Sequence, residues 1–327
     1  MKHLYWLTCT LIACLIGPPS FQSLAQGSFP GGRPVRIVVP SQPGPPPDAI
    51  SRIVAAVMAE KEGWKVLVEN KPGALQTIAM SEVLSQPADG LTIFPMTLGA
   101  LATPSLLPEK GLRLQTDFMA VAKLATGYAT LVVHPSLPIS TADELVAYLK
   151  SHPDALTYSS GGIGTPGHLL GENFKLQTGT AFTIVQYPSN QQRMADLVAG
   201  RTHFSFASTP TIVELVAVGK LRALAVAAPK QLAALPGVST IIEQGFPRLV
   251  AEDWVGLVVK GGTDPAIVKI LNAAVNRTLA EASVRDRFIS LGFEADAGAA
   301  GDLQRFIDTQ VPVWSEVVRH AGIKVAR

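Results

Sequence analysis

Residues 157–174 read TYSSGGIGTPGHLLGENF, and this stretch indicates how the chain folds. The pattern predicts a strand from Thr157 to Ser160 that runs through a glycine-rich loop into a helix from Thr165 to Gln177. Glycines let the backbone approach a ligand closely, and the free N–H groups at a helix N-terminus can bind an anion such as a carboxylate. The stretch therefore predicts an α/β unit that carries an anion-binding loop.

The same glycines resemble a nicotinamide-binding loop, because Gly162, Gly164 and Gly167 satisfy the G-x-G-x-x-G pattern. A dinucleotide fold also needs an acidic residue at the end of the next strand, where it binds a ribose hydroxyl. Here that strand ends in Gln186 and Tyr187. The sequence therefore predicts that the protein uses no nicotinamide and no other cofactor.

Upstream of this loop, strands and helices alternate in a way that is typical of a parallel sheet. Parallel sheets bind ligands beyond the carboxyl ends of their strands, so the loops at 40–47, 70–75 and 96–101 are candidate binding loops. The expected elements are strands at 35–39, 66–68 and 91–94, with helices that begin at Asp48 and near Gln76.

A second lobe is expected where the alternation restarts, near Leu131 to Pro138. The C-terminal helical stretches have no sheet of their own and should pack on the first lobe. Two strand crossings, near 131–136 and 252–258, would then form a hinge. We predict an α/β fold of two lobes, each a mainly parallel sheet flanked by helices. Lobe 1 would comprise residues 26–134 and 253–327, and lobe 2 residues 135–252.

Composition and missing motifs exclude several functions. The chain has 327 residues and 47% of them are hydrophobic, which is too apolar for a disordered protein. Its formal net charge of +2 gives no excess to attract nucleic acid or an anionic membrane surface. The histidines show no metal-binding spacing, and no G-x-S-x-G or Walker motif is present. We therefore expect neither an enzyme nor a metalloprotein.

The N-terminal segment predicts export. Lys2 and His3 precede an apolar run from Leu4 to about Leu15, and residues 1–25 end in the small-x-small pattern of a signal peptide. The run is short of the ~20 residues that span a bilayer. We expect a periplasmic protein whose mature part has no cysteine. Lipid attachment at Cys14 remains an alternative, because residues 11–14 resemble a lipobox.

Motifs along the whole mature chain resemble the periplasmic substrate-binding proteins of tripartite tricarboxylate transporters, the Bug family. They are RIVVP at 36–40, VENKPGA at 68–74, the 158–172 stretch, GKLRALAV at 219–226 and LPGVSTIIEQGFP at 235–247. The resemblance implies a periplasmic-binding-protein-like fold that closes on a small organic acid and delivers it to membrane transporter subunits. It implies no catalysis.

In this family, ligand carboxylates are bound largely by backbone N–H groups and waters in loops of both lobes. The resemblance therefore implies ligand-binding positions in both lobes of this chain. They are Ser41, Gln42, Gly44, Asp48, Gly73, Gln76 and Thr77 in lobe 1, and Ser160, Gly162, Gly164, Thr165, His168, Tyr187, Ser189 and Ser208 in lobe 2.

Two departures from the family pattern bear on the ligand. Pro45, Pro46 and Pro47 stand where glycine and small residues are common, so three potential N–H donors are missing. Ala207 replaces a frequent aspartate, which weakens the case for an amino-acid ligand. We expect the first lobe to contribute shape and apolar contact more than hydrogen bonds. An alternative function is a sensor or interaction protein that keeps the fold and has lost the usual ligand.

Overall fold

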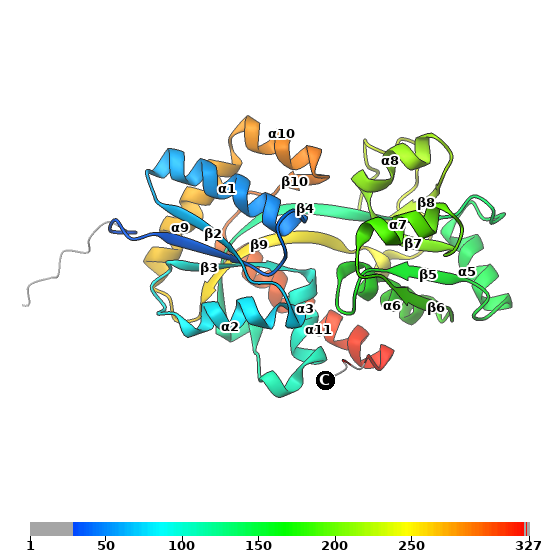
Figure 1. Ribbon diagram of the computed structural model, residues 1–327, viewed down its shortest axis with the longest axis horizontal. Helices are drawn as coiled ribbons and strands as arrows, with labels where there is room; N and C mark the ends of the chain where they lie inside the picture. The colour runs from blue at the N-terminus through cyan, green and yellow to red at the C-terminus, as the bar shows by residue number, and fades with distance from the viewer. Residues whose placement is uncertain (1–28, 324, 326–327) are drawn as a thin grey trace, which may run out of the picture.

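The computed structural model describes residues 29–323 and 325, so the expected signal peptide and both cysteines lie outside the described residues. Figure 1 shows two lobes connected by long strands. One sheet path runs through both of them in the order β2-β1-β3-β9-β4-β7-β5-β6. The predicted two-lobed α/β fold is confirmed.

Lobe 1 is a sheet covered by helices on both faces. Strands β1, β2 and β3 are parallel, and β9 joins them antiparallel. Side chains alternate between two cores: Ile37 and Val39 pack with α1, α9 and α10, whereas Val38 packs with α2, α3 and α11 on the opposite face (Figure 1). The elements are β1 (Val35–Val39), α1 (Pro46–Glu62), β2 (Val66–Asn70), α2 (Thr77–Ser85), β3 (Thr92–Thr97), α3 (Leu98–Leu106), α4 (Leu114–Asp117), β9 (Glu252–Lys260), α9 (Pro265–Leu279), α10 (Ala282–Ser290), β10 (Phe293–Ala295) and α11 (Ala300–Ala321).

Lobe 2 is built around an aromatic core. Tyr158 and four phenylalanines pack with ring centroids 4.9–6.4 Å apart. Helix α5 is capped by Thr141, whose Oγ1 accepts a hydrogen bond from the Glu144 amide at 3.1 Å. The elements are α5 (Ala142–Ser151), β5 (Thr157–Ser160), α6 (Pro166–Thr178), β6 (Thr183–Gln186), α7 (Asn190–Val198), β7 (Phe204–Ser208), α8 (Thr209–Ala217) and β8 (Arg222–Val226).

The connection between the lobes is a single long strand, β4 (Phe118–Val133), of which the sequence analysis recognised only the end. Its first part pairs with β9 as far as Tyr128 opposite Glu252, and its last part pairs with β7 from Ala129 opposite Ser208. The partner switch therefore falls at Tyr128–Ala129, earlier in the chain than the expected crossing at 131–136.

The C-terminal helices pack on lobe 1, as their lack of a sheet predicted. Helices α9 and α10 contact α1, whereas α11 contacts α3 and β4 and also reaches α6 of lobe 2. Helix α11 therefore connects the lobes in addition to β4 and β9.

Candidate functional site

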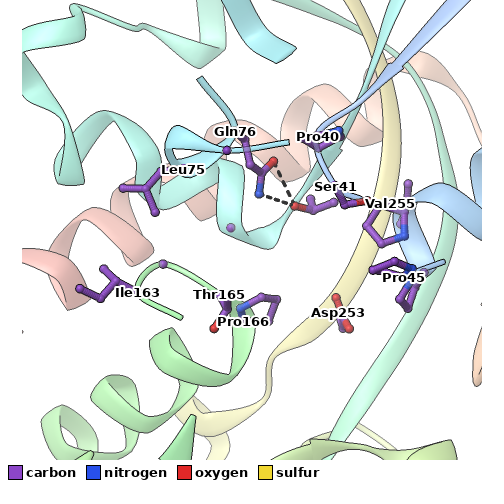
Figure 2. A pocket seen from close by; sticks show the side chains of 16 residues that line it. Pro40, Ser41, Pro45, Leu75, Gln76, Ile163, Thr165, Pro166, Asp253 and Val255 are labelled. Carbon is purple, nitrogen blue, oxygen red and sulfur yellow. Dashed lines mark hydrogen bonds between the residues drawn. The ribbon is translucent and has the colours of Figure 1, made fainter. Parts of the chain in front are cut away.

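A cavity of about 450 Å³ lies between the lobes (Figure 2). Its walls come from the segments that follow β1, β2 and β3 in lobe 1 and β5 in lobe 2, together with Asp253 and Val255 of β9. This is the position predicted from the sequence, at the carboxyl ends of parallel strands.

The structure brings five of the predicted site residues into the lining of this cavity: Ser41, Gly73, Gln76, Gly164 and Thr165. The other predicted positions are not among the lining residues. They are Gln42, Gly44, Asp48, Thr77, Ser160, Gly162, His168, Tyr187, Ser189 and Ser208.

The proline loop forms the first turn of α1. Pro45 is the N-cap, and Pro46 and Pro47 are the first two helical residues, which have no N–H to donate. The next two amides, of Asp48 and Ala49, both donate to the Pro45 carbonyl, at 2.9 and 3.1 Å. This helix terminus therefore presents no free N–H group to the cavity, and the polar groups of lobe 1 in the lining are the side chains of Ser41, Gln76, Thr97 and Asp253.

Asp48 stabilises the proline loop through hydrogen bonds within lobe 1. Its buried carboxylate accepts hydrogen bonds from the Gly44 amide at 2.9 Å, from Arg52 Nε at 3.0 Å and from Asn70 Nδ2 at 2.8 Å. Burial raises the pKa of this carboxyl, but the hydrogen bonds from Arg52, Asn70 and Gly44 outweigh it and hold the pKa below its ordinary value. All of these hydrogen-bond partners of the Asp48 carboxylate belong to lobe 1.

The turn after β2 is strained. Ala74, Leu75 and Gln76 have φ of 45°, 52° and 73°, a region that side chains with a Cβ rarely adopt. Gln76 Nε2 donates to Thr97 Oγ1 at 3.1 Å, the contact drawn in Figure 2. The turn thus places two side chains, Leu75 and Gln76, in the wall of the cavity.

Lobe 2 contributes the glycine-rich loop. Thr165 is the N-cap of α6 and its Oγ1 donates to the Gly162 carbonyl at 2.7 Å. Among the described residues, the amides of Gly162 and Ile163 have no hydrogen-bond partner. They are available to a ligand beside a helix N-terminus, where negative charge is stabilised.

His168 supports this loop and does not line the cavity. The Gly164 amide donates to its Nδ1 at 3.2 Å, and the side chain is buried. Burial, with a smaller contribution from Lys175, lowers the pKa of His168 to about 4. The ring is therefore neutral at physiological pH, which suits an acceptor for an amide.

The remaining lobe 2 positions cap or brace helices. Ser189 Oγ accepts from the Gln192 amide at the start of α7, and the Tyr187 hydroxyl donates to Asp196 at 2.7 Å. Ser208 is the N-cap residue of α8, but its side chain makes no capping hydrogen bond. The Ser189 and Tyr187 contacts stabilise the second lobe.

Asp253 was missed by the sequence analysis. It lies within β9 next to Trp254, and its half-buried carboxyl lines the cavity together with Val255, two residues further along the strand (Figure 2). Among the described residues it has no hydrogen-bond or ion-pair partner through its side chain. Burial raises the pKa of Asp253 to about 6. Its strand context alone gave no sign that this side chain faces the cavity.

Ser41 offers a second unused polar group. Its Oγ is buried, lies in the residue set that lines the cavity and has no hydrogen-bond partner in the described part of the chain. A buried hydroxyl without a partner costs free energy, and a ligand in the cavity could supply the partner.

Residues 50–323 match the Tripartite tricarboxylate transporter family receptor, TctC. The chain belongs to this family of solute-binding proteins. It is 29% identical to Protein BugT of Bordetella pertussis over 90% of each chain. Among solved structures, "R. palustris Rpa4515 with adipate" is 33% identical, with a TM-score of 0.76 over 90% of this chain and 99% of that one. MatC from Rhodopseudomonas palustris "with bound malate" is 29% identical, with a TM-score of 0.75 over 88% and 99%.

Residues 29–323 contain no helix with the length and apolarity needed to span a membrane. They also hold no group of three or more His, Cys, Asp or Glu side chains placed to bind a metal ion.

Proposed function

We propose that this protein is a periplasmic receptor that captures a small organic carboxylate between its lobes and delivers it to a tripartite tricarboxylate-type membrane transporter. The observation that carries the proposal is the cavity between the lobes, lined by Ile163, whose free amide lies beside the N-terminus of α6. Membership of the TctC receptor family and solved relatives with adipate and malate support the same ligand class.

Binding without turnover fits the chemistry of the lining. Its polar side chains are Ser41, Gln76, Thr97, Thr165 and Asp253. Gln76 and Thr97 bond to each other, and Thr165 bonds to the loop, so the described lining has no nucleophile paired with a base. The signal-like residues 1–25 support export to the periplasm.

The test is calorimetric titration of the mature protein with a panel of mono- and dicarboxylates, comparing Ile163→Pro with Ile163→Ala. Both variants lose the Ile163 side chain, but only proline removes the amide donor. A lost hydrogen bond to a charged group is worth roughly 1.5–3 kcal/mol, so Ile163→Pro should weaken binding roughly ten- to hundred-fold relative to Ile163→Ala. Circular dichroism checks that both variants fold.

Two outcomes would contradict the proposal. Formation of product from a bound acid would show an enzyme. Absence of heat with every acid in the panel would favour the alternative, a sensor or interaction protein that keeps the fold without the usual ligand.

A further inference from the structure

The cavity holds one acidic side chain and no basic one. Asp253 is the sole charged residue among those that line it, and Lys, Arg and His are absent from that set. The described residues give its carboxyl no hydrogen bond and no ion pair. The carboxyl of Asp253 therefore has no positively charged partner among the residues that line the cavity in which we propose that an organic acid binds.

Acidic side chains with a structural role in this protein have hydrogen-bond or ion-pair partners. Asp48 accepts hydrogen bonds from Gly44, Arg52 and Asn70. Asp196 is bonded to Tyr187 and Arg201. Asp253, in contrast, is half-buried in the lining that it shares with the prolines of the first α1 turn, and it has no such partner among the described residues. Because desolvated charges are costly unless paired, a bound ligand is the natural source of its partner.

The two ends of the cavity then differ in sign. The free amide of Ile163, which lines the cavity, and the N-terminus of α6 favour a carboxylate on the lobe 2 side. On the β9 side, a second carboxylate would meet the carboxyl of Asp253, and like charges at close range repel. An ammonium group there would form a charge-assisted hydrogen bond instead.

We propose that Asp253 determines the specificity of this cavity and that the ligand is a zwitterion, carrying an ammonium group for Asp253 as well as a carboxylate for the 161–165 loop. This inference rests on the proposed function, because it assumes that a carboxylate binds in the cavity. It replaces the expectation drawn from Ala207: the acidic partner for an amino group comes from β9 and not from the end of β7.

The experiment titrates the mature protein with two matched pairs of probes. L-aspartate differs from L-malate by an ammonium group in place of a hydroxyl, and 6-aminohexanoate, which has the same number of carbons as adipate, carries a terminal CH2–NH3+ group in place of one carboxylate. We expect at least one amino compound to bind ten-fold or more tightly than its partner. Asp253→Asn should lower the affinity for that amino compound and raise the affinity for its partner, inverting the preference.

Glu294→Gln is the matched control. It removes the same charge from an exposed side chain on β10, outside the cavity lining, and should leave both preferences unchanged. Preference for malate and adipate in the wild type, or a preference that Asp253→Asn does not alter, overturns the inference while leaving carboxylate binding intact. Absence of binding by all four probes and by the wider acid panel overturns the proposed function and this inference together.

Discussion

The unpaired carboxyl of Asp253 predicts that Asp253→Asn stabilises the ligand-free protein. Asparagine keeps the shape of the side chain and removes the charge. A rise in pKa from 3.8 to about 6 corresponds to about 3 kcal/mol of unfavourable free energy for the ionised form in the folded state. Water in the open cavity screens part of this, so we expect Asp253→Asn to add about 1–3 kcal/mol at neutral pH.

The stability gained by Asp253→Asn should depend on pH, and the direction of this dependence would show that the gain comes from removing an ionised carboxyl. The folded pKa lies above the unfolded one, so between them the folded state binds more protons, and stability is lost as pH rises through about 6. Below about pH 3 the carboxyl is mostly protonated in both states and Asp253→Asn should change little, whereas at pH 4 about 0.5 kcal/mol of the gain should remain. Above pH 7 the whole gain should be present.

The measurement is thermal unfolding at pH 4 and pH 7.5, without ligand. For a chain of this size, 1 kcal/mol shifts Tm by roughly 2 °C, so we expect a rise of about 2–6 °C at pH 7.5 and no more than about 1 °C at pH 4. Glu294→Gln, which removes an exposed charge, should shift Tm at neither pH. An unchanged or lower Tm for Asp253→Asn at pH 7.5 would refute the reasoning, and an equal rise at both pH values would assign the gain to something other than ionisation.

Two further predictions concern the cavity walls. Gly164 has a φ of 75° and a Cβ there would lie 2.9 Å from Leu75 Cδ2 in the other lobe, so Gly164→Ala should hinder closure and weaken ligand binding. Gly179→Ala, at φ 64° with nothing within 4 Å of the added Cβ, should cost a similar ~1 kcal/mol of stability in urea unfolding and leave affinity unchanged. Replacing Pro45 and Pro46 with glycine restores two N–H groups beside the cavity and should tighten adipate binding in calorimetry. Pro265→Gly at the start of α9 is the control for added flexibility, and equal affinities in the two proteins would show that the missing donors do not limit binding.

Much of the fold could be predicted because most of its strands are short and apolar and are followed by helices, of which α5, α6, α7 and α9 begin at a capping side chain. The long strand β4 was harder to predict, because its nearly continuous burial gives no alternation of apolar and polar residues that would mark its start. Its pairing with β9 also contains two register shifts, between Ala120 and Ala122 and between Lys123 and Ala125. Irregular register of this kind depends on the partner strand and cannot be derived from one strand's sequence.

The site was predictable at the level of loops and less so at the level of side chains. The carboxyl ends of β1, β2, β3 and β5 do surround the cavity, as a parallel sheet requires. The sequence could not predict that the Asp253 side chain points into the cavity. This orientation depends on the pairing of Asp253 with Gly127 in the irregular β4–β9 ladder. The three consecutive positive φ values at Ala74–Gln76 could not be predicted from the sequence either, because none of these residues is glycine.

The position of Asp253 gives the two proposed ligand contacts different roles in closure. Its strand partner Gly127 is adjacent to the Tyr128–Ala129 switch, where β4 passes from one lobe to the other. A group at a crossing moves least when the lobes rotate about it, so an ammonium group could bind Asp253 before the lobes close. The 161–165 loop lies on lobe 2 and meets Leu75 and Leu106 of lobe 1 through Gly164, so its amides reach the carboxylate only when the lobes are together. Affinity for the cation would therefore select the ligand, and the carboxylate contact would stabilise the closed receptor.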